Sequence, residues 1–410
     1  MNFEKFVAKR LHGESNIKHS ISKPILKMAI AAVSLSIAVM ILSIATSKGL
    51  QNKISGKVTG FTADIQVSTL DLNKSLDANP FKVDTSLTES LRAIEGVDFL
   101  QTQITKNALL KTETDFEGIL VKGVHQNYHW EFISKNLIEG ILPDFSTEKK
   151  SNEIIISKVL ASKLQLKLND KALVYFQGLK NNKARIRKFL IVGIYETGIE
   201  FFDDLYIIAD QRHLQKINNW SEDQVSSLEI RLKPNADKDW VYKEVESRSP
   251  YNARVRTVKE MYPQIFDWIN LFDLNTVVIL LIMLIVASIN MISSLLIIIL
   301  ERTKMIGLLK ALGAGKYSIR KIFLYHAFYL LRKGLLIGNG IGLTLIGIQY
   351  YFEPIQLDPT HYYVKALPVY LSLENWLLIN LMSVLICMLI LILPTLLLHK
   401  IEPVKALRYE

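Results

Sequence analysis

The segment GAGKYS at residues 313–318 has the residue types of a phosphate-binding loop, a glycine-rich turn followed by lysine. The nucleotide-binding pattern GxxxxGK[ST] requires Gly at position 310 and Ser or Thr at position 317. The chain has Lys310 and Tyr317 at these positions, and no strand pattern leads into the segment. We therefore expect no ATP or magnesium site in this chain, and no ATP hydrolysis by the chain alone.

Other residues that could do chemistry are isolated from partners of the required type. His125 and His129 lie four apart in HQNYH, but this segment lacks the glutamate of a zinc-protease helix and is surrounded by strand patterns. No GxSxG pattern is present, and the single cysteine, Cys387, lies in an apolar run. The sequence therefore predicts no metal site and no catalytic site, and the chain is not expected to be an enzyme.

Four uncharged runs carry most of the apolar residues, in a chain of 410 residues with 50% hydrophobic content. A helix of about 20 apolar residues crosses the roughly 30 Å hydrocarbon layer of a membrane. A core helix of a soluble protein rarely stays uncharged for so long. We expect four transmembrane helices, from the runs 28–46, 274–300, 334–352 and 376–398. We assign them to the domains 28–47, 271–300, 316–352 (with a cytoplasmic lead-in) and 376–398.

The charges on either side of these runs predict the topology. Residues 1–27 hold six Lys and Arg against two acids, and residues 301–333 hold eight against one. Residues 47–273 hold 31 of each sign, and residues 353–375 hold one Lys against three acids. By the positive-inside rule, both termini and the 301–333 loop are cytoplasmic. The expected location is the inner membrane, with domain 48–270 and the short loop 353–375 in the periplasm. The net charge of +10 is then a topology signal and does not indicate a nucleic-acid partner.

Both ends of the chain are expected on the cytoplasmic side, the tail being residues 399–410. In domain 1–27, Phe3, Phe6 and Val7 recur at helical spacing among lysines, which predicts an amphipathic helix on the membrane surface. A disordered basic tail is the alternative. The first apolar run could also be a cleaved signal peptide, but its length and the 27 residues before it favour an uncleaved anchor.

The large segment between the first two apolar runs alternates strand and helix patterns. Short runs rich in β-branched residues, such as NEIIISKV and ARIRKFLIVGIY, predict strands. Runs such as DQRHLQKI and DKDWVYKEVESR predict short helices. We therefore expect a mixed α/β domain without disulfides, followed by a helix that is kinked at Pro263 and leads into the second apolar run.

Small and polar residues in the apolar runs predict where the helices pack. Gly334, Gly338 and Gly342 lie four apart, so they share one helix face on which a neighbouring backbone can approach closely. Chance spacing in a glycine-tolerant membrane helix is the alternative. Asn290 is a polar residue near the middle of the second run, and we expect it to form a hydrogen bond to a neighbouring helix.

The 301–315 segment between the second and third runs predicts one short amphipathic helix. Its apolar arc, about 100° wide, contains Met305, Leu308, Leu309 and Leu312. The opposite face carries Thr303, Lys304 and Lys310. Gly313 and Gly315 are expected to end the helix and reverse the chain. Because a helix lying on lipid needs no such abrupt return, we favour docking to a partner protein.

The segment ERTKMIGLLKALGAGKYSIRKIF resembles the coupling segment of FtsX/MacB-type ABC transporter permeases. In that family a pattern E-[KR]-x-x-E-I-x-[IL]-L-[KR]-x-[IL]-G-A joins the second and third spans, and Met305 replaces the usual acid. The chain is most similar to the lipoprotein-releasing (LolC/LolE) branch. This similarity extends to VASINMISSLLIIILER, NEIIISKVLASKLQLKLNDKALVYF, GIYETGIEFFDDLYIIADQRHLQKI and the closing EPVKALRYE.

The resemblance implies a permease subunit that works with a separate ATPase, which binds the ATP and Mg²⁺, and with a second permease copy or paralogue. It implies that ATP-driven motion reaches the periplasmic domain and releases lipoproteins from the membrane to a periplasmic carrier. The residues expected to contact the ATPase are Glu301, Arg302, Lys304, Met305, Leu308, Leu309, Lys310, Leu312 and Gly313.

Three other functions remain open from the sequence. A MacB-like export permease has the same topology but a different cargo, and usually a fused ATPase. An FtsX-like regulator of cell-envelope enzymes usually has a much smaller external domain. A membrane-anchored enzyme would need a catalytic group in the external domain, and the sequence shows no pattern for one.

Overall fold

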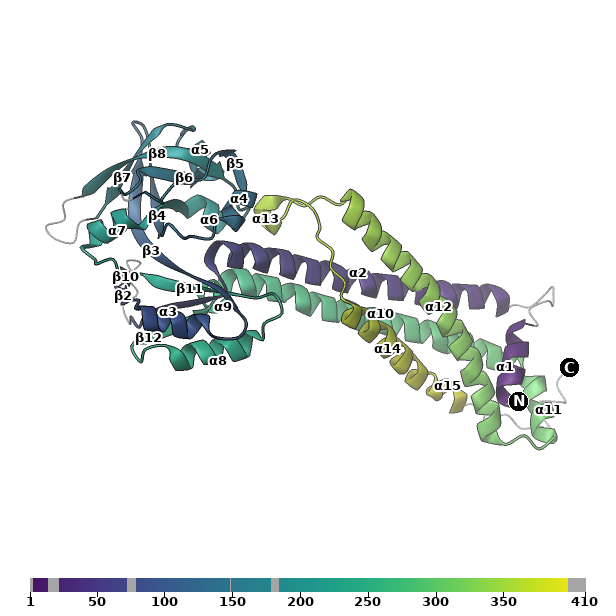
Figure 1. Cartoon of the computed structure of the whole chain (residues 1–410). Helices are drawn as coiled ribbons and strands as arrows, with labels where there is room; N and C mark the ends of the chain where they lie inside the picture. Colours follow the sequence, from purple (N-terminus) through teal and green to yellow (C-terminus); the bar gives the residue numbers. More distant parts are fainter. Residues whose placement is uncertain (1–2, 14–21, 72–78, 148, 178–183, 397–410) are drawn as a thin grey trace. The chain divides into compact units, whose positions relative to one another are not determined.

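The structure is a computed structural model that describes residues 3–13, 22–71, 79–147, 149–177 and 184–396 (Figure 1). The chain divides into two compact units. A helical unit comprises Met1–Asn52, Trp268–Leu357 and Ala366–Glu410, and an α/β unit comprises Lys53–Asp267 and Asp358–Lys365. The expected cytoplasmic tail 399–410 and part of domain 1–27 lie outside the described residues.

Long helices form the helical unit. Among the described residues, four helices are long and apolar enough to cross a membrane. These are α2 (Ser22–Thr62), α10 (Pro263–Glu301), α12 (Lys316–Phe352) and α14 (Leu373–Ile390), the last continued by α15 (Ile392–Leu396). The shorter helices are α1 (Phe3–Gly13) and α11 (Thr303–Ala311).

Two of the long helices extend well beyond the apolar runs that predict them. Helix α2 continues to Thr62, because Leu50, Ile54, Val58 and Phe61 recur at helical spacing and are all buried. Helix α12 begins at Lys316, 18 residues before the uncharged run, and Ile319, Phe323 and Leu330 are buried in that extension. Amphipathic segments therefore lengthen both helices outside their uncharged runs.

The predicted kink at Pro263 is a complete helix break. Helix α9 (Val258–Met261) ends before Tyr262, whose φ of −126° and ψ of 56° are not helical, and α10 begins at Pro263. Proline has no N–H to donate and its φ suits the first helical position, so it starts a helix more readily than it bends one. The expected continuous helix with a bend is therefore wrong at this point.

The α/β unit is built on one large mixed sheet of ten strands in the order β12-β1-β11-β3-β4-β9-β6-β8-β5, with β7 paired to β3 and β8. Most pairs are antiparallel, but β4 pairs with β9 and β6 with β8 in parallel. The strands are β1 (Ile65–Thr69), β3 (Val97–Lys111), β4 (Phe116–Val124), β5 (Leu137–Gly140), β6 (Glu153–Ser157), β7 (Lys171–Phe176), β8 (Arg185–Tyr195), β9 (Tyr206–Asp210), β11 (Ser227–Leu232) and β12 (Ala253–Thr257). Strands β2 (Phe81–Lys82) and β10 (Gln224–Val225) form a small separate sheet.

Short helices connect and cover these strands (Figure 1). Leu87 and Leu91 of α3 and Val241 and Val245 of α8 bury their side chains in the core of the unit. The predicted mixed α/β domain is confirmed. Its helices are α3 (Thr85–Arg92), α4 (Glu131–Lys135), α5 (Lys158–Lys163), α6 (Glu200–Leu205), α7 (Gln211–Asn218), α8 (Lys238–Arg248), α9 and α13 (Pro359–Tyr362).

A buried ion pair fastens the last turn of α2 to the sheet. Lys122 on β4 lies 3.0 Å from Glu229 on β11 and donates a hydrogen bond of 2.6 Å to the Phe61 carbonyl. Both charged side chains are almost fully buried, and Gln101 donates a further hydrogen bond to Glu229. Burial alone would lower the pKa of Lys122, but the adjacent Glu229 raises it above its ordinary value, so the lysine stays charged.

Candidate functional site

Helix α11 is the predicted coupling segment, and it follows α10 after a one-residue break. Arg302 has φ −99° and ψ 19°, which interrupts the helix, yet its carbonyl accepts the Ile306 N–H at 3.0 Å. The Thr303 hydroxyl donates to the Leu300 carbonyl at 2.7 Å. These bonds satisfy backbone groups that a helix end leaves open, so the chain changes direction without losing its hydrogen bonds.

The C-terminus of α11 is a Schellman motif. Gly313 has a φ of +87°, its N–H donates to Lys310, and the Ala314 N–H donates to Leu309. This pair of hydrogen bonds requires a residue with a left-handed backbone at the first position after the C-cap, where glycine has no steric penalty. Gly315 has an ordinary φ of −67° and caps the start of α12. The predicted reversal therefore depends on Gly313, and Gly315 begins the next helix.

The structure separates the predicted apolar arc of α11 into two faces. Ile306 is fully buried, and Met305 and Leu309 pack beside it against the core of the helical unit. Leu308 is 53% exposed and Leu312 is 76% exposed. Met305 and Leu309 are half-buried and pack against the helical core, so the contact with the ATPase that the resemblance implies for them stays a prediction. The outward apolar residues are Leu308 and Leu312.

Charged side chains surround this outward face. Glu301 and Lys304 are exposed, whereas Arg302 and Lys310 are half-buried. Partial burial and the nearby charge of Lys316 lower the pKa of Lys310. Tyr317, on the first turn of α12, is 79% exposed and was not predicted as part of the site. A single aromatic residue after a turn has no periodic partner in the sequence, so only its exposure identifies it.

The predicted glycine face of α12 lies against α2. A Cβ built on Gly334 would lie 2.6 Å from Val33, and one on Gly338 would lie 2.6 Å from the Ser34 carbonyl oxygen. Gly342 is less tight, with Ile41 at 3.3 Å. The backbones of α2 and α12 therefore approach closely where these glycines lie, which is how small residues hold membrane helices together.

Polar side chains form hydrogen bonds between two helices of the helical unit, but not at Asn290, where such a bond is predicted. Asn290 is half-buried and donates to the Val286 carbonyl of its own helix at 3.0 Å, instead of the expected bond to a neighbouring helix. Asn339 on α12 instead donates to Asn380 on α14 at 2.7 Å and accepts from the Trp376 indole at 2.6 Å. Sequence reasoning missed this cluster because Asn339 and Asn380 lie 41 residues apart on different helices, and no local pattern joins them.

The geometry of α11 suits protein contact and not bond-breaking chemistry. It offers two exposed leucines with cations around them, on a helix whose other face is packed into the helical core. In the described part of the chain, no group of three or more His, Cys, Asp or Glu is placed to hold a metal ion. Such a face can dock into an apolar groove of another protein.

Comparisons with known proteins identify the family. The family model described as the MacB-like periplasmic core domain matches residues 28–248, more than half of the chain. The model described as FtsX-like permease C-terminal matches residues 277–403, which contain α11. The chain belongs to the FtsX/MacB-type permeases. The family matches cover both the α/β unit and the apolar helices, which fit a membrane protein.

Curated relatives of this permease match over nearly their whole length. It is 22% identical to the lipoprotein-releasing system transmembrane protein LolC of Neisseria meningitidis serogroup B, over 93% of this chain and 94% of that protein. It is 21% identical to LolC of Buchnera aphidicola, over 87% of each chain. It is 20% identical to LolE of Haemophilus influenzae, over 84% of each.

Two solved structures resemble part of the permease. The extracellular domain of the noncanonic ABC-type transporter YknZ from Gram-positive bacteria is 14% identical and covers 47% of this chain and 99% of its own, with a TM-score of 0.33. The periplasmic region of MacB from Actinobacillus actinomycetemcomitans is 10% identical and covers 51% of this chain and 95% of its own, with a TM-score of 0.35.

Proposed function

We propose that this chain is the permease subunit of an ABC transporter, and that a separate ATPase subunit docks on α11. The observation that carries this proposal is the outward face of α11, where Leu308 and Leu312 are exposed on a helix fixed between α10 and α12. The family matches support it, since the FtsX-like match spans this helix. The partner ATPase supplies the ATP and Mg²⁺ chemistry, and a second permease subunit completes the transporter.

The proposed mechanism transmits a push on α11 to the α/β domain through α10 and α2. Both helices cross a boundary between the two units, which lies after Asn52 in α2 and before Trp268 in α10. Helix α2 continues ten residues past Asn52, and α10 begins five residues before Trp268. A continuous helix resists bending better than a loop does, so it suits transmission of force. Lys122 and Glu229 bind the last turn of α2 into the sheet, which gives that force a rigid point of attachment.

The proposed cargo is a lipoprotein, released from the inner membrane to a periplasmic carrier. Support comes from the relatives named as lipoprotein-releasing proteins, which match over most of their length. Extraction of an acyl chain from lipid costs about 0.8 kcal/mol per CH₂ group, so the step needs an energy source. ATP hydrolysis by the partner supplies that energy while the permease itself forms and breaks no covalent bond.

Release of an acylated lipoprotein from proteoliposomes tests this function. The permease is reconstituted with its partner ATPase, its second permease subunit and a lipoprotein from the same cell, and ATP and a soluble carrier are then added. We expect ATP-dependent transfer of the lipoprotein to the soluble fraction, and none with a non-hydrolysable ATP analogue. Full ATPase activity with every lipoprotein retained in the membrane would reject lipoprotein release.

A further inference from the structure

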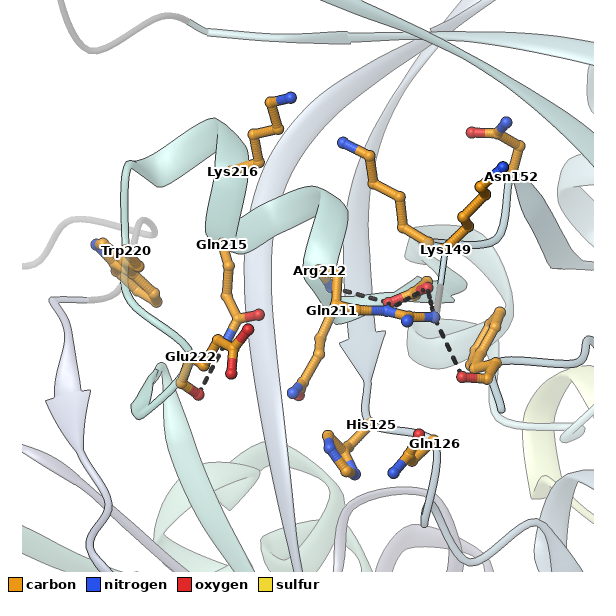
Figure 2. Close-up of a pocket in the computed structure, with 13 residues that line it drawn as sticks. His125, Gln126, Lys149, Asn152, Gln211, Arg212, Gln215, Lys216, Trp220 and Glu222 are labelled. Carbon is orange, nitrogen blue, oxygen red and sulfur yellow. Dashed lines mark hydrogen bonds and ion pairs between the residues drawn. The ribbon is translucent and has the colours of Figure 1, made fainter. Parts of the chain in front are cut away.

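A large basic cavity lies in the α/β unit, and the proposed coupling mechanism gives no role to the residues that line it. Figure 2 shows the cavity between α7 and the segment before β6. Helix α7 contributes Gln211, Arg212, Gln215 and Lys216, and the segment before β6 contributes Lys149 and Asn152. Its volume is about 890 Å³. The described residues that line it are His125, Gln126, Phe145, Lys149, Lys150, Asn152, Asp210, Gln211, Arg212, Gln215, Lys216, Trp220 and Glu222.

Arg212 and Asp210 form an ion pair in the wall of the cavity. Arg212 donates to both carboxylate oxygens of Asp210, at 2.6 to 3.0 Å, and to the carbonyls of Phe145 and Thr147. Asp210 also accepts the Ser151 N–H at 2.9 Å. Asp210 is almost fully buried and its carboxylate accepts hydrogen bonds from Arg212 and Ser151, so the two charges of the pair neutralise each other.

Three lysines of the lining have no such partner in the part of the chain that the structure describes. Among the described residues, Lys149, Lys150 and Lys216 form no ion pair, although Asp210 and Glu222 line the same cavity. Burial lowers the pKa of Lys150, and the charges of Lys216 and Arg187 lower it further. Like charges that lie close together repel each other, and an anion bound between them removes that repulsion.

The donor types favour a phosphate group over a carboxylate. Lysine ammonium groups bind phosphate as point charges, whereas planar two-point recognition of a carboxylate uses an arginine fork, and the fork of Arg212 is already bonded to Asp210. The cavity is far larger than a bare ion, and Trp220 and Phe145 give it apolar surface for an attached group. Gln215 holds the Trp220 side of the wall by donating to the carbonyls of Ser221, Glu222 and Gln224.

We propose that this cavity binds a phosphate-bearing anion, with Lys150 and Lys216 as its charged contacts and Lys149 beside them. The group bound is a phosphate monoester or a lipid headgroup that carries one. This site is independent of the ATPase contact on α11, since the two lie in different units of the chain.

Calorimetric titration of the full chain in detergent tests the site with three probes: inorganic phosphate, glycerol 3-phosphate and a short-chain phosphatidic acid. We expect saturable binding of at least one probe, which weakens as salt rises. The double change Lys150→Gln and Lys216→Gln should weaken binding roughly tenfold or more, because it removes both charged donors. The matched control Lys167→Gln and Lys171→Gln, two exposed lysines of the same unit, should leave binding unchanged.

The probes also separate the two sources of phosphate. Equal affinity for glycerol 3-phosphate and phosphatidic acid supports a site for the phosphate monoester itself, whereas binding of phosphatidic acid alone supports a lipid headgroup. Thermal unfolding of each variant checks that the fold is kept. We expect no decrease in the unfolding temperature, because the substitutions remove lysine charges that repel each other. The proposal is overturned if no probe binds, or if the folded Lys150→Gln and Lys216→Gln variant binds as tightly as the original chain.

Discussion

Lys122 shows how a single residue connects a long helix to the sheet. Its ammonium group binds Glu229, the Phe61 carbonyl and the face of the Phe61 ring, whose centroid lies 5.0 Å away. A buried charge is tolerated only when it is paired and hydrogen-bonded, so each group depends on the others. The sequence does not predict this pair, because 107 residues separate its members and no local pattern joins the two strands that carry them.

The change Lys122→Met should strongly destabilise the α/β unit, because it leaves Glu229 buried without its cation. The expected loss is about 3–5 kcal/mol. The double change Lys122→Met with Glu229→Gln removes both charges and keeps an acceptor for Gln101, so it should lose less. Thermal unfolding in detergent measures both variants. If the single variant proves as stable as the original chain, the ion pair does not have the role assigned to it.

Gly313 carries the turn after α11 through its left-handed backbone. We expect Gly313→Ser to cost about 1–2 kcal/mol locally, because a Cβ opposes a φ of +87°. Gly315→Ser is the matched control, since Gly315 has an ordinary φ and caps a helix, a position that serine favours. Hydrogen exchange of the 303–316 region should speed up in the first variant only. Equal hydrogen-exchange rates in the two variants would contradict the claim that the turn depends on the left-handed backbone of Gly313.

At the scale of elements, α2 and α12 are held together by the glycine face. Gly338→Val should destabilise the helical unit, because the new Cβ would meet the Ser34 carbonyl at 2.6 Å and the backbone there cannot move aside. Gly340→Val is the matched control, since nothing lies within 4 Å of its added Cβ. The yield and thermal stability of the protein in detergent measure the effect. If both variants are equally stable, close packing at Gly338 is not required.

Most elements could be predicted from local patterns, and those that were missed lack such patterns. Strands β6 and β9 and the second half of β8 are rich in β-branched residues and are largely buried, so their composition identifies them. Strand β3 is the longest strand at 15 residues, yet its sequence VDFLQTQITKNALLK mixes polar and apolar residues without a clean period. It is stabilised by pairing with β4, β7 and β11, which no local pattern reveals.

The candidate site was predicted as a segment, but its orientation was not. Amphipathic spacing and the two glycines indicate a short helix ending near Gly313, as observed. Spacing alone cannot tell which edge of an apolar arc packs inward when the arc is wide. The core beneath α11 takes Ile306, with Met305 and Leu309 beside it, and so leaves Leu308 and Leu312 outside.

At the scale of the whole molecule, the charge pattern predicts the topology. We expect Lys188→Cys, an exposed site on β8, to react in intact cells with a maleimide that cannot cross the inner membrane, in a Cys387→Ser background. Tyr317→Cys should react only after the inner membrane is opened. The positive-inside rule gives this direction, since basic residues concentrate in the 301–333 loop. Labelling in the reverse order would overturn the topology.

Docking of the ATPase on α11 is the central claim, and co-purification of a tagged partner ATPase with the permease tests it most directly. Leu308→Glu with Leu312→Glu places charges on the outward face, and a buried leucine contributes about 1.5–3 kcal/mol, so the ATPase should be lost. The matched control Leu70→Glu with Leu109→Glu changes two exposed leucines of the α/β unit instead. We predict that both variants insert in the membrane, that the control variant keeps the ATPase and that the α11 variant loses it. Full retention of the ATPase by the α11 variant would contradict the account.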